Sequence, residues 1–116
     1  MRRHSVIFER WDVVTVEFPF VEGAGSKRRP ALIVSTDRLR QDYGVYWIVM
    51  ITTAKAGQKQ GDVEVSDRAR AGLPEECVIR ASRLMTIGDT QIGRKLGNIT
   101  PKDRNAVSAF LKRYAP

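Results

Sequence analysis

The stretch from Trp11 to Thr36 most constrains the fold, because it contains two β-like runs joined by a loop. The first run, WDVVTVEFPF, has the period-two alternation that is typical of a half-buried strand. The alternating apolar positions are Val14, Val16, Phe18 and Phe20. The segment GAGS that follows favours a loop, and the apolar run Ala31–Val34 indicates a strand buried on both faces. Pro30 restricts Arg29 to extended geometry, so a cation is held where the loop enters the second strand.

The rest of the chain predicts further short strands. The run VYWIVMI at Val45–Ile51 is rich in β-branched and aromatic residues and is the best candidate for a central strand. Other strands are expected at Asp62–Val65 and Arg94–Ile99, and Cys77–Ile87 is expected to form one long or bent strand or two short ones. Asp37–Gly44 and Ala54–Gly61 are expected to be connections. Ser66–Glu76 is expected to be a short helical turn or ordered loop, capped by Ser66.

The helix expected over residues 100–114 is the clearest single element. Thr100 suits the N-cap and Pro101 suits the first helical position. The apolar residues that share one face by their spacing are Val107, Phe110, Leu111 and Tyr114. Packing of that face on a sheet is the favoured interpretation. Five or six short strands followed by one helix predict a mainly β fold, with a small, strongly curved antiparallel sheet or barrel.

Length and composition predict a single domain that covers residues 1–116. The chain is 42% hydrophobic and 28% charged, which is ordinary for a soluble globular protein. No apolar run approaches the length of a membrane span, so no membrane partner is expected. The apolar patch at residues 6–8 is too short for a signal peptide. A cytoplasmic location is therefore expected.

The chain is strongly basic, with a formal net charge of +7 and a pI of about 10.1. Such a charge favours a polyanion or an acidic protein as partner over cations that only solvate the surface. Cys77 is the only cysteine, so no intrachain disulfide is expected, and a buried structural thiol is favoured over a nucleophile. With one cysteine and one histidine, His4, neither a zinc site nor another metal or cofactor is expected.

The sequence also argues against much familiar chemistry. The body of the chain contains no histidine, no acidic pair at a marked spacing, and no Walker or GxGxxG pattern that opens a helix. Chemistry would therefore fall to arginine, threonine, serine, tyrosine or isolated carboxylates. This set suits phosphoryl chemistry on RNA, because the ribose 2′-OH supplies the nucleophile and the protein need only align groups and stabilise charge. A guanidinium matches two phosphate oxygens at once.

In this order, the segments WDVVTVEFPF, GAGSKRRP, ALIVST, VMITT, VIRASRLMTI and KLGNIT resemble the MazF/PemK family of toxin endoribonucleases. The resemblance covers Trp11 to the final helix and leaves residues 1–10 as an N-terminal extension. It implies an SH3-like barrel of five to seven antiparallel strands with a C-terminal helix. It also implies a homodimeric toxin that cleaves single-stranded RNA without a metal, leaves 2′,3′-cyclic phosphate and 5′-OH ends, and is silenced by a cognate acidic antitoxin.

The resemblance further implies roles for single residues. The family's key arginine falls on Arg29, and its hydroxyl residue at the end of the third strand falls on Thr52. In the PemK branch an arginine and an aspartate two residues apart also act. Arg80 matches that arginine, but Ser82 occupies the aspartate position, and His4 lies too early to match that branch's histidine. These departures favour Arg29 and Thr52 as the catalytic pair.

Arg29 is assigned to stabilising phosphate charge and to proton donation to the leaving oxygen, and Thr52 to a hydrogen bond with a phosphate oxygen. Charge stabilisation is the safer role, because a free guanidinium loses its proton only above about pH 12. The possible auxiliary residues are Thr53, Arg80 and Ser82. The candidate RNA-binding residues are Ser26, Lys27, Arg28, Lys55 and Lys59. The aromatic residues Trp11, Phe20 and Trp47 offer surfaces for base stacking, although core packing is favoured for them.

Three functions stay open at this point. The first is a metal-independent endoribonuclease toxin. The second is a non-catalytic barrel that binds RNA or a protein, a degenerate relative of the toxins, which Ser82 favours. The third and weakest is a protein of the same fold that acts on DNA gyrase.

Overall fold

A computed structural model of the 116-residue chain describes residues 6–18 and 27–115. Phe20, Ser26 and the loop expected at residues 23–26 lie outside the described residues. The strands are β1 Asp12–Phe18, β2 Lys27–Ile33, β3 Val45–Thr53, β4 Asp62–Glu64, β5 Cys77–Gly88 and β6 Ile92–Asn98. The α-helices are α1 Asp37–Tyr43, α2 Arg68–Ala71 and α3 Pro101–Tyr114, with short 3-10 turns at Ala54–Ala56 and Asp89–Gln91.

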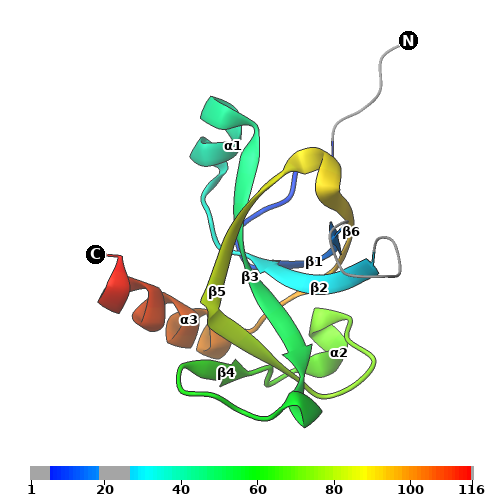
Figure 1. The fold of residues 1–116 in the computed structure, drawn as a ribbon, viewed down its shortest axis with the longest axis vertical. Helices are drawn as coiled ribbons and strands as arrows, with labels where there is room; N and C mark the ends of the chain where they lie inside the picture. The colour runs from blue at the N-terminus through cyan, green and yellow to red at the C-terminus, as the bar shows by residue number, and fades with distance from the viewer. Residues whose placement is uncertain (1–5, 19–26, 116) are drawn as a thin grey trace.

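The strands form one six-stranded sheet in the order β4-β5-β3-β2-β1-β6, with every neighbouring pair antiparallel. The predicted mainly β fold with a C-terminal helix is confirmed. The sheet is strongly curved, and β3 and β5 run together as its longest ladder (Figure 1). It is open, however, because the described pairings leave β4 and β6 as edge strands and do not close the expected barrel.

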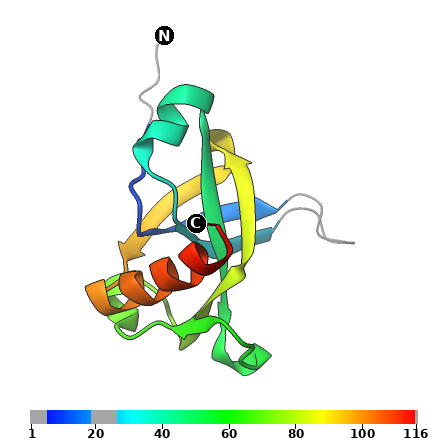
Figure 2. The same cartoon turned by 90° about the vertical axis from the view of Figure 1, so that its left-hand side faces the viewer.

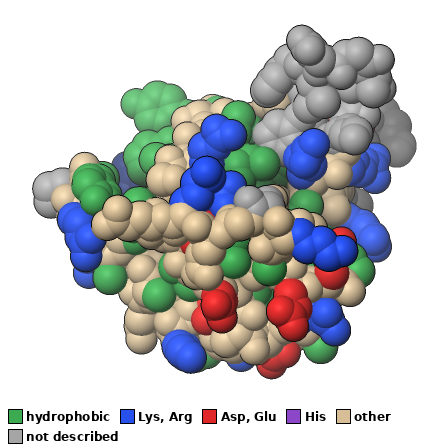
Figure 3. Space-filling model, turned by 60° about the horizontal axis from the view of Figure 1, so that its bottom comes forward, with side chains coloured by type: hydrophobic (Ala, Val, Ile, Leu, Met, Phe, Trp, Pro, Cys, Tyr) green, Lys and Arg blue, Asp and Glu red, His purple; other side chains and the backbone are tan. Residues whose placement is uncertain are grey.

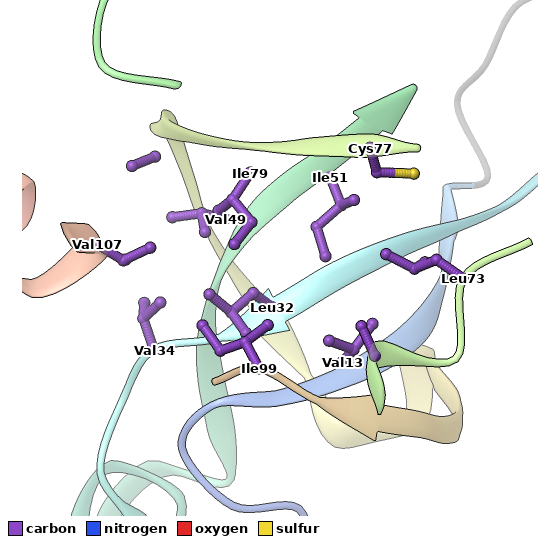
Figure 4. Packing of buried hydrophobic residues seen from close by; sticks show 12 residues of the cluster. Val13, Leu32, Val34, Val49, Ile51, Leu73, Cys77, Ile79, Ile99 and Val107 are labelled. Carbon is purple, nitrogen blue, oxygen red and sulfur yellow. The ribbon is translucent and has the colours of Figure 1, made fainter. Parts of the chain in front are cut away.

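Two apolar clusters cover the two faces of the sheet. The first lies under α2 and α3, where Leu32, Val49 and Ile79 meet Val107 of α3 (Figure 4). Figure 2 shows α3 lying across this face. The second cluster fills the concave face at the other end, around Tyr46 and Ile48. The central strands are therefore buried on both sides, as the apolar runs in β2 and β3 predicted.

Burial on both faces also changes the interpretation of β1. Its alternation predicted a half-buried strand, but Val13 and Val14 are both fully buried although they point to opposite faces. Val13 belongs to the first cluster and Val14 to the second. The curvature of the sheet explains the difference, because it brings apolar side chains over both faces of β1.

Local hydrogen bonds account for two further differences from expectation. Asp37–Gly44, expected to be a connection, forms α1, whose side-chain bonds from Arg40 and Gln41 to Asp37 lie at helical spacing. The short helix α2 is capped by Asp67, which accepts from the Arg70 N–H at 3.0 Å. Ser66, the expected cap, instead donates from its backbone N–H and its hydroxyl to buried Asp103 at the start of α3.

The C-terminal helix begins as its sequence predicted. The Thr100 hydroxyl accepts from the Asp103 N–H at 3.2 Å, and Pro101 occupies the first helical position. Val107 is buried and Phe110 and Leu111 pack against the first cluster, which confirms the packing face as far as Leu111. Tyr114 at the end of that face is exposed. No helix in the described part of the chain is long and apolar enough to cross a membrane.

Candidate functional site

Strand pairing brings the two residues of the expected catalytic pair to one place. In the β2–β3 ladder Ala31 lies opposite Met50. This is the last pair of that ladder, and its register continued by two residues on each strand would set Arg29 opposite Thr52. Side chains alternate between the faces of a strand, so Arg29 and Thr52 project from the same face as Ala31 and Met50.

Arg29 stands at the border between core and solvent. Its partner across the β1–β2 ladder is Val16, which is fully buried, whereas Arg29 itself is exposed. The following residue, Pro30, lies opposite Thr15 within the same ladder. The backbone of Arg29 is therefore held in the sheet while its guanidinium reaches water.

Thr52 is half-buried near the end of β3 and pairs with Val78 of β5. Thr53, an expected auxiliary residue, pairs with Cys77 and alternates to the other face. The structure therefore separates the two threonines, and only Thr52 shares a face with Arg29. Cys77 is buried, as predicted, and burial raises the pKa of its thiol, with a further contribution from Glu75.

Arg80 lies on the same face, opposite Met50 on β5 and opposite Asp62 on β4. It was expected either to face substrate or to form a surface ion pair. It forms an ion pair that is largely buried, since the side chains of Arg80 and Asp62 are only 14% and 1% exposed. Arg80 Nε donates to Asp62 Oδ1 at 3.2 Å and Nη2 donates to Oδ2 at 3.0 Å. Arg80 Nη2 also donates to the Gly57 carbonyl at 2.8 Å.

This pair shifts the pKa of both members. Burial opposes the charged form of Asp62, but the hydrogen bonds from Arg80 and from the Lys59 backbone outweigh it and lower the pKa of Asp62 below 3.8. The hydrogen bonds to Asp62 raise the pKa of Arg80 above its ordinary value. Arg80 is therefore a fixed cation and not a proton donor.

Ser82 lies apart from this face. Between the pairs Val49–Leu84 and Met50–Arg80, β5 carries an irregularity that includes Ser82. Ser82 is exposed and lines a groove of about 470 Å³ between β5 and the end of α3. The groove, called here the α3 groove, is lined by Gln60, Gly61, Ala81, Ser82, Leu84, Phe110, Leu111, Arg113, Tyr114 and Ala115.

The described candidate RNA-binding cations lie in β2 and in the segment between β3 and β4. Arg28 lies opposite Glu17 in the β1–β2 ladder, is exposed, and alternates to the face opposite Arg29. Lys55 and Lys59 are exposed in the segment between β3 and β4. Lys27 is the first residue of β2. Figure 3 shows lysine and arginine side chains on several parts of the forward face, with acidic side chains gathered lower in the view.

Two observations bear on what this site can do. Among residues 6–18 and 27–115, no group of three His, Cys, Asp or Glu side chains comes together to hold a metal. The sheet face instead presents a free guanidinium, a hydroxyl and a carboxylate-bound guanidinium. This arrangement is suited to binding a phosphate and stabilising its negative charge.

Sequence reasoning missed Asp62 as a member of this cluster. Asp62 and Arg80 are distant in the chain and meet only because β4 pairs with β5. The one available signal was the alternation predicted for Asp62–Val65, which placed Asp62 on a strand but gave no partner. The prediction that Trp47 packs in the core was also wrong, because its side chain on β3 is 44% exposed.

Comparison with known proteins finds the same fold. The family described as PemK-like, MazF-like toxin of type II toxin-antitoxin system matches residues 9–114. An endoribonuclease in complex with its cognate antitoxin from Mycobacterial species is 23% identical, with a TM-score of 0.69, over 92% of this chain and 93% of that one. MazF from the Deinococcus radiodurans MazE-MazF complex (Form-II) is 18% identical, with a TM-score of 0.72, over 93% and 94%. The Mycobacterium tuberculosis toxin MazF-mt6 is 20% identical, with a TM-score of 0.68, over 88% and 93%. No curated protein sequence matches the chain.

The Arg80–Asp62 pair predicts how stability depends on pH. The pKa of Asp62 is lower in the folded protein than its ordinary value of 3.8, so the pair stabilises the fold above that pH. This stabilisation is lost as the pH falls from 3.8 through the folded pKa. The unfolding free energy of wild type should therefore fall on acidification, and that of Asp62→Asn should fall less. Urea denaturation between about pH 2.5 and 6 measures this difference.

Asp42→Asn is the matched control, because it removes an exposed aspartate–arginine pair in α1. Its acid dependence should stay close to that of wild type. If the unfolding free energies of wild type and Asp62→Asn changed with pH in the same way, the stabilising role of the Arg80–Asp62 pair would be contradicted.

Proposed function

Because the chain belongs to the PemK-like, MazF-like family of type II toxin–antitoxin toxins, which matches residues 9–114, we propose that it is an endoribonuclease that cleaves single-stranded RNA. The observation that carries the proposal is the shared sheet face of Arg29, Thr52 and Arg80. A net charge of +7 supports a polyanionic substrate.

In the proposed reaction the ribose 2′-OH gives its proton to water and attacks the adjacent phosphorus, and the bond to the 5′-oxygen breaks as that oxygen leaves and takes up a proton. The products are a 2′,3′-cyclic phosphate and a 5′-OH end, and no metal takes part. Arg29 binds the non-bridging phosphate oxygens and stabilises the charge that develops on them. Its guanidinium, which is exposed to solvent, is also assigned the proton for the leaving oxygen and would regain it from water. Thr52 donates a hydrogen bond to the same phosphate, and Arg80 adds a second fixed positive charge.

Backbone binding is proposed for cations around this face. Lys55 and Lys59 follow Thr52 in the chain and would contact phosphates on one side, with Lys27 at the start of β2 on the other. Arg28 is not proposed to bind at this face, because it alternates to the opposite one. Ser26 belongs to this proposal by sequence alone, because it lies outside the described residues. Thr53 and Ser82 are not proposed to act in chemistry, because Thr53 faces the other side of the sheet and Ser82 lines the α3 groove.

Cleavage of a mixed RNA pool in EDTA tests the proposal. Wild type should produce 2′,3′-cyclic phosphate ends, detected by mass spectrometry of the fragments. Arg29→Ala should lower kcat by about 100-fold or more, because a preorganised group that stabilises charge in the transition state is lost. Arg29→Lys should recover only part of the rate, because an ammonium does not make the two-pronged contact.

Arg38→Ala is the control, because Arg38 is an exposed cation on α1. It should cleave like wild type. RNA binding without cleavage by wild type would reject the enzyme and favour the non-catalytic RNA-binding alternative.

The sheet face is also the proposed binding site of an acidic antitoxin. A disordered acidic segment is the expected partner, because it complements the cations around Arg29 and folds on binding. The relatives in antitoxin complexes support a partner of this class. In the same RNA assay, the small acidic protein encoded beside the gene should abolish cleavage at equimolar amounts. Full activity in its presence would reject this partner.

A homodimer is proposed through the α3 groove and the adjoining strand surface. Trp47, Leu84 and Tyr114 are 44%, 48% and 68% exposed. Trp47 and Leu84 are diagonal neighbours in the β3–β5 ladder, and Leu84 and Tyr114 both line the groove. A second copy that meets this surface through a two-fold axis would bury all three residues and lengthen the RNA-binding face.

Light scattering after size exclusion tests the dimer. Wild type should have twice the mass of one chain, and Leu84→Lys should shift it to a monomer because a charge would be buried. Tyr43→Lys is the control, since Tyr43 is 75% exposed on α1, and it should leave the mass unchanged. A monomeric wild type would reject the proposal.

A further inference from the structure

We propose that Asp62 is a positioning residue of the cleavage site, which holds the guanidinium of Arg80 so that its Nη1 edge meets the phosphate bound by Arg29 and Thr52. The inference rests on the proposed endoribonuclease function and deepens it by assigning a residue on the edge strand β4 to the site. Asp62 acts through Arg80 and does not touch the RNA.

The first argument is the way in which Asp62 uses the donors of Arg80. A guanidinium has five N–H groups in one plane. The Asp62 carboxylate accepts one hydrogen bond from Nε–H and one from an N–H of Nη2, and the Gly57 carbonyl accepts a hydrogen bond from the second N–H of Nη2. These three bonds fix both the position and the rotation of the plane. Nη1 keeps two N–H groups for which no partner lies among the described residues.

Burial gives the second argument. The side chain of Asp62 is 1% exposed and that of Arg80 is 14% exposed. Among the described residues no buried side-chain nitrogen or oxygen lacks a hydrogen-bond partner. Nη1 of Arg80 therefore reaches solvent, while Nε and Nη2 face the protein. The exposed part of this cation is the edge that can bind an anion.

The sheet register places Arg80 on the same face as the proposed site. Arg80 lies opposite Met50 and Val78 lies opposite Thr52 in the β3–β5 ladder. Arg80 and Thr52 are therefore diagonal neighbours on one face, where side chains lie within reach of a shared ligand. A phosphate bound between Arg29 and Thr52 would be approached by Arg80 from the β5 side.

Asp62 also joins this cation to the lysine-bearing segment before β4. Its Oδ2 accepts from the Lys59 N–H at 2.8 Å, and its own N–H donates to the Lys59 carbonyl at 3.0 Å. One carboxylate thus sets the position of Arg80 and the turn that carries Lys59. Formation of the ion pair costs free energy, because two charges lose water. A role in positioning Arg80 toward substrate would explain why such a pair lies beside the site.

A double-mutant cycle in the RNA cleavage assay tests the proposal. We expect Asp62→Asn to lower kcat by about 10- to 100-fold, with a smaller change in KM, because a displaced guanidinium no longer meets the transition state. In an Arg80→Ala background, Asp62→Asn should cause no further loss, because its effect passes through Arg80. Asp42→Asn, which breaks an exposed pair in α1, should leave kcat unchanged.

Four outcomes overturn the inference. Wild-type turnover in Asp62→Asn would do so, and so would an equal loss in the presence and absence of Arg80, which marks a purely structural role. If urea denaturation shows that Asp62→Asn is unfolded, Asp62→Glu is tested in its place. This variant keeps the negative charge, but its side chain is one methylene longer and displaces the guanidinium of Arg80. Asp62→Glu should fold and still lose turnover, and wild-type turnover in it would overturn the inference. A wild type that cleaves no RNA rejects the proposed function itself, and with it the role of Asp62.

Discussion

Burial of both faces of the sheet is the constraint on which the rest of this structure depends. The middle of β2 and of β3 carries apolar side chains that point alternately into two separate clusters. A polar side chain there would lose its water without compensation. Polar side chains that could act on a ligand are therefore confined to strand ends, irregularities and edges, and the candidate residues Arg29 and Thr52 lie toward the ends of adjacent strands.

The Arg80–Asp62 pair follows the same constraint. Arg80 lies beyond the apolar middle of the β3–β5 ladder, next to the edge strand β4. The loss of water around the Arg80 guanidinium is compensated there, because a carboxylate and a backbone carbonyl accept hydrogen bonds from three of its N–H groups. The edge strand thus extends the sheet and also supplies the carboxylate partner of Arg80. β4 is only three residues long, and one of these residues is Asp62.

Local patterns predicted the elements well where one signal dominated. The N-cap of α3, the long strand Cys77–Ile87 and the central strand at Val45–Ile51 depended on nearest neighbours in the chain. Local patterns misled where two signals competed. The polar segment Asp37–Gly44 lacks an apolar face, and its helix is held by side-chain bonds at helical spacing that hydrophobic periodicity does not detect. Trp47 is a large aromatic residue within an apolar run, which favoured core packing, but the structure leaves it 44% exposed.

The sequence by itself determined that the fold is mainly β with a terminal helix. It also determined that Arg29 enters a buried strand beside Pro30 and that any chemistry would fall to arginine, hydroxyl side chains or isolated carboxylates. These conclusions rest on alternation, backbone stereochemistry and the absence of other reactive groups, which are properties of residues close together in the chain. Only the tertiary structure decided that Thr52 and not Thr53 shares the face of Arg29, that Ser82 lies apart, and that a carboxylate reaches Arg80 from β4. The physical reason is strand register, because a shift of one residue turns every side chain to the other face.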